Sequence, residues 1–175
     1  PVLTGDAVAA STTAPYVVSA GSTSGGAANG ITTTITGVFL GCKYYNSNVG
    51  RTVWNSYWPG SGASGDVEAY VCTNPEQLYI VQGSTGGVLG TSVVGFVVPM
   101  SITNSSLGNT LSGQSVMTVQ SSLVTGLSTA GQFKIVDMYS NYAPPGTNGT
   151  STGSEGWQIA IVQPNNTQRR TQTGS

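Results

Sequence analysis

Side-chain character repeats with a period of two in most apolar segments of this chain, and this periodicity limits the folds open to it. The repeat is clearest in residues 38–45, 67–72 and 157–162, where apolar residues occupy every second position. These segments are rich in β-branched and aromatic residues, which is typical of half-buried strands. We predict strands near residues 15–19, 31–45, 51–57, 66–72, 77–82, 91–98, 115–120, 132–139 and 157–163.

Clusters of Gly, Ser, Asn and Pro separate the predicted strands and indicate turns and loops. One segment, residues 112–123, also has helical spacing, since Val116, Val119 and Leu123 lie three and four positions apart. Its Ser, Thr and Val residues are poor helix formers, so a strand is the preferred interpretation. Short strands without alternating helices indicate an all-β fold, either a single β-barrel or a β-sandwich.

The length of 175 residues favours one domain. We place an N-terminal arm at residues 1–14, the all-β domain at 15–163 and an extended polar C-terminal arm at 164–175. The C-terminal arm holds Arg169 and Arg170, two of the 5 cationic residues. We name both arginines as candidate partner-binding residues, because their guanidinium groups can meet acidic groups of a neighbouring subunit.

Formal charge is scarce. The chain has 5 Lys+Arg, 6 Asp+Glu and no His, so 6% of its residues are charged, against about 25% in a typical soluble domain. Five cations cannot form the basic surface that nucleic acid requires, and the absence of His excludes a histidine triad or metal site. Residues 7–42 and 77–133 carry no charge at all. Such a neutral surface predicts coverage by neighbouring subunits, and so a homo-oligomer.

Two further features limit the partners and the redox state. No apolar run of 18 residues is present, so we expect no membrane partner. Cys42 and Cys72 are the only cysteines, too few for a disulfide scaffold. A pair of buried thiols is the preferred interpretation, with a disulfide as the alternative.

Patterns that carry chemistry in enzymes have simpler explanations here. Residues 60–65 match G-x-G-x-x-G, but a strand is predicted after them, whereas a dinucleotide site needs a helix there. Asp66, Glu68 and Asp137 include a candidate pair for glycoside hydrolysis, yet the same residues suit solvated strand ends. We therefore predict no catalytic residue, no metal site and no cofactor, and a protein that is not an enzyme.

Aromatic residues are densest in one region, which contains Tyr44, Tyr45, Trp54, Tyr57 and Trp58. Such rings fill a core, form a protein interface or, when exposed, stack on sugar rings, and the sequence leaves these alternatives open. We take Trp54, Tyr57 and Trp58 as candidate partner-binding residues.

Two blocks of sequence resemble small structural proteins of tailed bacteriophages, in particular marine ones. The first block comprises residues 37–45, 51–59 and 66–71, and the second comprises 132–138 and 157–165. The resemblance implies a small β-rich virion component, best represented by head decoration (cement) proteins, and it brings no catalytic motif.

We therefore expect a non-enzymatic decoration protein on the capsid surface of a virion, with the major capsid protein and copies of itself as partners. From a different functional class, the alternative is a carbohydrate-binding β-sandwich module, secreted or part of a phage fibre or tail. In that module Trp54, Tyr57 and Trp58 would form the sugar platform.

Overall fold

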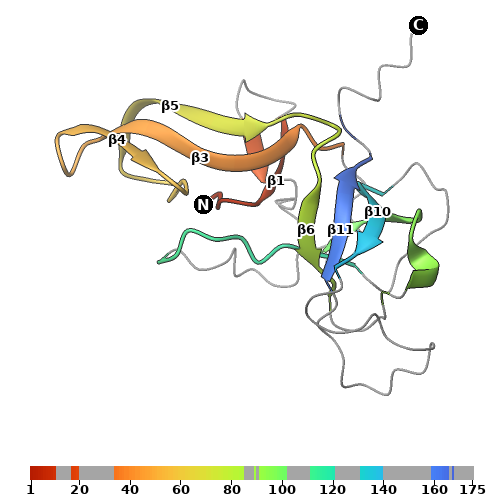
Figure 1. The fold of residues 1–175 in the computed structure, drawn as a ribbon. Coiled ribbons are helices and arrows are strands. Elements are labelled where there is room, and N and C mark those ends of the chain that lie inside the picture. The colour runs from red at the N-terminus through yellow and green to blue at the C-terminus, as the bar shows by residue number, and fades with distance from the viewer. Residues whose placement is uncertain are drawn as a thin grey trace, which may run out of the picture.

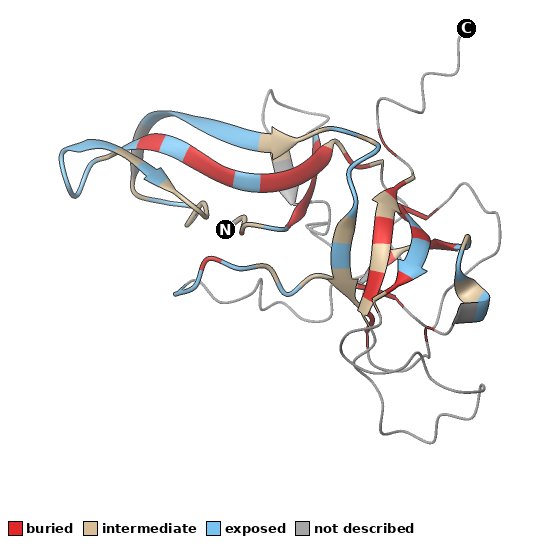
Figure 2. Cartoon of the chain, viewed as in Figure 1, coloured by how far each residue is buried: buried red, intermediate tan, exposed pale blue. Residues whose placement is uncertain are grey.

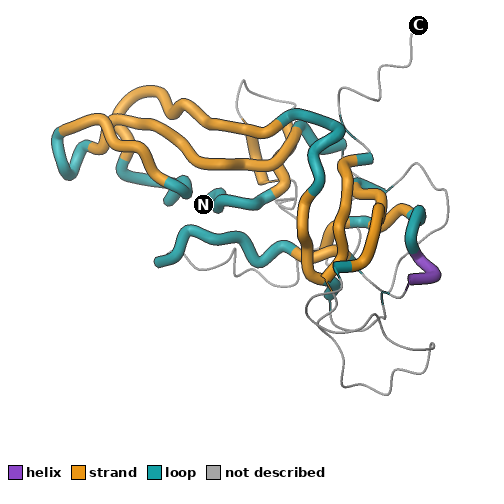
Figure 3. Tube along the Cα trace, in the orientation of Figure 1, coloured by secondary structure: helices purple, strands orange, loops and turns teal. Residues whose placement is uncertain are grey.

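The computed structural model describes residues 1–10, 17–19, 34–84, 89, 91–101, 111–120, 131–139, 159–165 and 167. These residues form an all-β fold, as the sequence predicts (Figure 1). The one helical element among them is a single 3-10 turn, η1 (Thr91–Val93) (Figure 3). The described strands form two main sheets and do not close into a barrel, which agrees with the sandwich alternative.

The first sheet is organised around β3. Its strands are β1 (Ala7–Ala10), β2 (Val17–Ser19), β3 (Gly37–Asn46), β4 (Arg51–Asn55) and β5 (Ala63–Cys72). β5 pairs with β3 along nearly its whole length. On the opposite edge of β3, β4 pairs with residues 42–46 and β1 with residues 37–38. The three strands β3, β4 and β5 project away from the second sheet, and we call them the blade (Figure 1).

A β-bulge at Leu40 decides which side chains of β3 are buried together. Phe39 and Cys42 are three positions apart, so in a regular strand they would point to opposite faces. The register with β5 shifts directly after Phe39, and the extra residue brings both side chains to one face. There Phe39, Cys42 and Tyr44 pack with Val8 in one buried cluster.

The second sheet carries the larger core. Its strand order is β6 (Tyr79–Gln82), β11 (Ile159–Pro164), β10 (Phe133–Met138) and β7 (Val97–Val98), while β8 (Met100–Ser101) pairs with β9 (Thr118–Val119). Buried residues recur along β10 and β11 (Figure 2). Ile135, Ala160 and Val162 pack with Ala7 and Ile35 from the N-terminal part of the chain. This cluster joins the second sheet to β1 of the first.

The first ten residues belong to the fold, whereas the sequence placed them in an arm. Leu3 and Val8 are fully buried, and β1 pairs with both β2 and β3. Val2 exchanges two backbone hydrogen bonds with Trp58, at 2.9 and 2.7 Å. A four-residue strand of Ala and Val gives a weak sequence signal, and pairing with its neighbours is what stabilises it.

The polar C-terminal segment also begins later than the sequence indicated. Pro164 is the last residue of β11. Thr167 is buried and forms a parallel bridge with Ile35. Residues 168–175, which include Arg169 and Arg170, lie outside the described residues.

Two of the predicted strands are shorter in the structure, because turns occupy part of each segment. The predicted strand at 91–98 begins with η1 and retains only β7 as a strand. In the described part of segment 112–123, a turn leads into β9 and no helix forms, so the preference for a strand is confirmed there.

Both cysteines are free thiols, as the preferred interpretation has it, but only Cys42 is buried, and Cys72 is half-buried where the sequence predicted a buried thiol. The pairing of β3 with β5 places Cys72 opposite Val38, and Cys42 opposite Ala69. The two cysteines are thus separated by roughly 10 Å along the sheet, because Ala69 and Cys72 are three positions apart on β5 at about 3.3 Å per residue. A disulfide spans a Cα separation of less than about 7 Å, so the strand register prevents a bridge.

Alkylation should distinguish the two thiols. Cys42 is fully buried, and burial raises the pKa of its thiol, whereas Cys72 is half-buried. We expect iodoacetamide to label Cys72 before Cys42 in the folded protein, because a buried thiol carries little reactive thiolate. Intact mass after denaturation without reductant should show two labels. An unlabelled protein, lighter than the reduced form by two hydrogens, would contradict the register.

Asp6 is a buried carboxylate directly before β1. It is 2% exposed, and its Oδ2 accepts a hydrogen bond from the Leu3 N–H at 2.8 Å. Burial raises the pKa of Asp6 above its ordinary value, although hydrogen bonds from Ser115 and Leu3 oppose the rise. The folded protein therefore holds this proton more strongly than the unfolded chain. The resulting stabilisation is full below the unfolded-state pKa and is lost as pH rises through the folded-state pKa.

The variant Asp6→Asn should remove this part of the pH dependence, because the Asn side chain can still accept the Leu3 hydrogen bond but does not titrate. We expect the free energy of unfolding of the wild type to fall relative to that of the variant as pH rises from 3.5 to 7. Urea unfolding at several pH values measures the difference. Asp66→Asn, at an exposed position, is the control. A wild-type-to-variant difference that stays constant with pH would contradict the burial argument.

Candidate binding surface

One face of the blade presents aromatic side chains to solvent. We call it the aromatic face, and its residues are Lys43 and Tyr45 on β3, Trp54 on β4, and Glu68 and Tyr70 on β5. Lys43 is directly opposite Trp54 on one side and Glu68 on the other, and residues two positions apart share a face. Trp54 is 63% exposed, Tyr45 44% and Tyr70 38%. β5 and much of the tip of the blade are correspondingly exposed in Figure 2.

Gly41 provides the space in which the Trp54 ring lies. A Cβ at position 41 would come within 2.8 Å of Trp54 Cζ2 and 2.9 Å of the Asn55 carbonyl oxygen. The φ angle of Gly41 is +151°, a region that side-chain-bearing residues rarely adopt. Tyr70 pairs with Gly41 from β5. Trp54, Gly41 and Tyr70 therefore form an aromatic stripe across the three strands, in which the Trp54 ring lies over Gly41.

The structure separates the three aromatic residues that the sequence suggested as one binding site. Only Trp54 lies on the aromatic face. Trp58 packs edge-on against Tyr44, with ring centroids 5.1 Å apart and planes at 81°, and so joins the buried cluster on the opposite face. The half-buried Tyr57 lies against Gly113, where an added Cβ would be 3.0 Å from Tyr57 Cδ1. Trp58 and Tyr57 hold the sheet to neighbouring segments, and of the three residues only Trp54 is largely exposed.

Formal charge on the aromatic face is sparse, and the exposed Asp66, two positions before Glu68 on β5, adds a carboxylate at its border. Lys43 stands in the row between Trp54 and Glu68. One cation and one carboxylate in adjacent positions give little net field at the surface, and exposed pairs of this kind contribute only about 0 to 1 kcal/mol. Arg169 and Arg170 lie outside the described residues, so their part in binding stays a prediction.

The geometry of the carboxylates gives no support to a hydrolytic site. Asp66 and Glu68 alternate along β5 and are both exposed, whereas Asp137 lies on β10 in the second sheet. Within the described part of the chain, no group of three or more His, Cys, Asp or Glu could hold a metal ion. Residues 60–62 form a bend, and residues 63–65 already belong to β5, so no helix follows this motif.

The described residues include no helix long and apolar enough to cross a membrane. Comparisons with protein-family models, curated proteins and solved structures find no match for this chain. The function is therefore inferred from the aromatic face, the charge distribution and the strand edges.

Sequence reasoning did not include Tyr45 and Tyr70 among the candidate partner-binding residues, although both lie on the aromatic face. The period-two pattern of residues 66–72 places Tyr70 on the same face as Glu68, and this signal was readable. For Tyr45 the signal was ambiguous, because the bulge at Leu40 changes which residues of β3 share a face. That Trp54 and Tyr70 lie close to each other depends on the register of the strands, which a period-two pattern does not specify.

Proposed function

We propose that this chain is a non-enzymatic structural protein of a bacteriophage virion, which binds the capsid surface and stabilises the shell through contacts with capsid subunits. The aromatic face of the blade is the observation that carries this proposal. Trp54 and Tyr70 are exposed there on a projecting element, and these residue types are enriched among those that contribute most to protein–protein binding. The sequence resemblance to head decoration proteins supports a capsid as the partner.

Apolar burial would supply most of the binding energy. Interfaces of standard size bury about 800 Å² on each partner, and apolar area contributes roughly 25 cal/mol per Å² before the costs of association. The aromatic face offers large rings at its centre and only Lys43 and Glu68 as charged members. This arrangement suits a partner that presents a neutral, apolar surface.

The edges of the blade add a second kind of contact. Among the described strands, β4 and β5 each pair with β3 alone, so the outer edge of each remains open. Open edges present backbone donors and acceptors to an extended segment of a neighbouring subunit. Backbone pairing at an edge, together with the aromatic rings on the face, would fix the orientation of the protein on the shell.

A carbohydrate-binding module remains the second candidate, because one observation favours it. The stripe has two exposed rings, Trp54, which lies over Gly41, and Tyr70 on the neighbouring strand, which suits stacking against sugar rings. Trp54 would then act in place of the three-residue platform expected from the sequence.

The variant Trp54→Ala tests the aromatic face. Removal of the exposed ring should weaken attachment to virus particles about 30-fold or more, which corresponds to the roughly 2 kcal/mol typical of a central interface residue. Co-sedimentation with particles of the encoding phage that lack this protein measures the effect. Phe96→Ala is the control, since Phe96 is 37% exposed and precedes β7 in the second sheet.

Equal attachment of the wild type and Trp54→Ala would show that the protein does not bind particles through the aromatic face. A wild type that does not bind particles would overturn the capsid proposal. If it instead binds immobilised glycans, and Trp54→Ala abolishes that binding, the carbohydrate-binding alternative is established.

The salt dependence of attachment provides an independent test of the inference that charged groups contribute little to binding. At 1 M NaCl the Debye length falls to about 3 Å, which suppresses surface electrostatics but leaves apolar contacts intact. We expect the protein to remain attached when NaCl rises from 0.1 to 1 M. Deletion of residues 168–175 should weaken attachment more than this salt step, because it removes contacts as well as Arg169 and Arg170.

The deletion must begin after Thr167, because Thr167 is buried and Gln163 belongs to β11. Gln163 Nε2 also donates to Glu76 Oε2 at 2.7 Å. Sedimentation of particles at both salt concentrations and with both chain lengths measures attachment. Release by 1 M NaCl alone would show that a few charges govern binding.

A further inference from the structure

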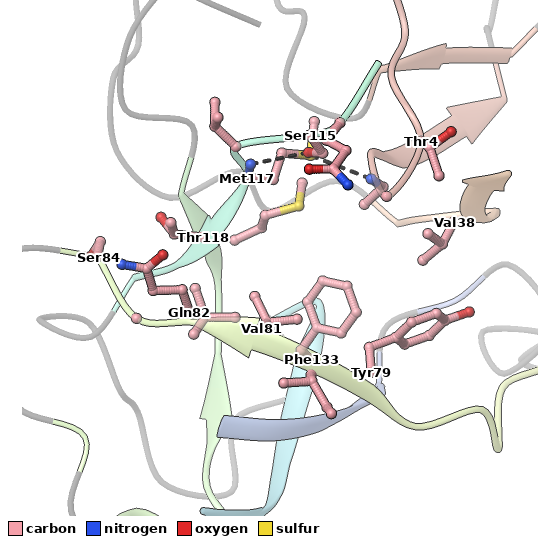
Figure 4. A pocket seen from close by; sticks show the side chains of 18 residues that line it. Thr4, Val38, Tyr79, Val81, Gln82, Ser84, Ser115, Met117, Thr118 and Phe133 are labelled. Carbon is pink, nitrogen blue, oxygen red and sulfur yellow. Dashed lines mark hydrogen bonds between the residues drawn. The ribbon is translucent and has the colours of Figure 1, made fainter. Parts of the chain in front are cut away.

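A cavity of about 840 Å³ lies between β6 and residues 114–119, and we call it the wedge (Figure 4). All of residues 79–84 and all of residues 114–119 border it. Successive side chains of a strand point to opposite faces. A cavity bordered by every successive residue therefore meets the backbone edges of both segments. Val81, Phe133 and Met117 lie around its centre in Figure 4.

The two segments are joined at one end of the wedge. Gly83 and Val119 form a parallel bridge there, and the Ser84 N–H donates to the Val119 carbonyl oxygen at 2.7 Å. A parallel ladder continued from this bridge would bring the rest of β6 against residues 115–118. The cavity occupies that place.

The other end of segment 114–119 is held by the N-terminal segment. Gln114 forms a parallel bridge with Thr4, and the Ser115 N–H donates to the Thr4 carbonyl oxygen at 2.9 Å. The segment thus pairs with β6 at Val119 and with Thr4 at its beginning. This change of partner separates the two strands and opens the wedge.

The edge of β6 that faces the wedge is available for pairing. Among the described strands, β6 pairs with β11 alone. Backbone N–H groups alternate between the two edges of a strand. Because the Ser84 N–H points toward Val119, the N–H groups of Gln82 and Ile80 point to the same side. Such an edge is a template for another strand.

We propose that the wedge accepts an extended, uncharged strand from a second copy of this chain, which pairs with the open edge of β6. The inserted strand would continue the second sheet by one strand and place its inward side chains against Val81, Phe133 and Met117. Insertion between β6 and residues 114–119 would fill a space far larger than the voids of a close-packed interior.

The absence of formal charge around the wedge favours a second copy of this chain as the occupant. None of the residues that border the wedge carries a formal charge, so a charged side chain inserted there would be buried without a partner, at a cost of several kcal/mol. In an ordinary domain about one residue in four is charged. This chain offers residues 7–42 and 77–133 without any charge, and its strands therefore match the wedge.

This inference goes beyond the proposed function, which concerns capsid binding, and names a site for the self-association that the uncharged segments of the sequence predict. It does not depend on the aromatic face, which lies on the blade. The two sites can therefore be inactivated separately.

The experiment uses the full chain. Sedimentation velocity over a hundredfold range of protein concentration should show a concentration-dependent oligomer. Hydrogen–deuterium exchange should show slow exchange of the Ile80 and Gln82 amides at high concentration and fast exchange after dilution, because strand addition gives these two donors a partner.

Two variants should prevent strand addition at the wedge in different ways. Val81→Arg places an unpaired charge inside it and should weaken self-association at least tenfold. Ile80→Pro removes one edge donor without changing the pairing with β11, and Ile80 is 61% exposed, so little packing is lost. Leu78→Arg is the control, since Leu78 is 48% exposed and does not border the wedge. Circular dichroism verifies that each variant is folded.

We expect Val81→Arg and Ile80→Pro to associate more weakly than the wild type. The control Leu78→Arg should associate as the wild type does. A wild type that stays monomeric at every concentration, or folded wedge variants that associate as the wild type does, would overturn the inference. Particle binding separates this failure from that of the proposed function, because Val81→Arg retains Trp54 and should still attach to capsids.

Discussion

The pairing of β3 with β5 is the interaction on which the rest of the first sheet depends. It contains the bulge at Leu40, which turns Phe39 and Cys42 to one face and lets them pack with Tyr44. The same register separates the two thiols. It also places Tyr70 beside Gly41. The ring of Trp54, from β4 on the other edge of β3, lies over the same glycine. A regular ladder would place Phe39 and Cys42 on opposite faces, so one inserted residue defines both the buried cluster and the aromatic face.

The scarcity of charge shapes how this surface can bind. With 6% charged residues, Coulombic attraction would contribute little to the affinity of the proposed binding, which would depend on buried apolar rings and paired backbone edges. The blade provides both, since Trp54 and Tyr70 are exposed on its face and its outer strands have open edges. Neutral surfaces also lack the like-charge repulsion that keeps soluble proteins apart, which is consistent with a protein that acts in an assembly.

The N-terminal segment connects the two parts of the fold and also creates the wedge. Ala7 packs in the core with the second sheet, while β1 pairs with β3. Thr4 forms backbone hydrogen bonds and a bridge with residues 113–115. This pairing holds the beginning of segment 114–119 away from β6, so the segment pairs with β6 only at Gly83. The contact that secures one sheet to the other thus leaves an edge of the second sheet open. Sequence periodicity identified β6 as a strand but carried no information on which of its edges would lack a partner.

The sequence by itself determined the all-β class, the approximate positions of most strands and the scarcity of charge, because period-two alternation and composition are local properties that require no knowledge of neighbours. It did not determine the strand in the first ten residues, where a short run of Ala and Val becomes a strand only by pairing. Nor did it separate the aromatic residues: Trp54 and Trp58 are close in sequence, yet one is exposed on the blade and the other packs against Tyr44. Tertiary structure decided these features, because strand register, bulges and edge pairing arise between segments that are distant in the chain, and a shift of one residue moves a side chain from the core to the surface.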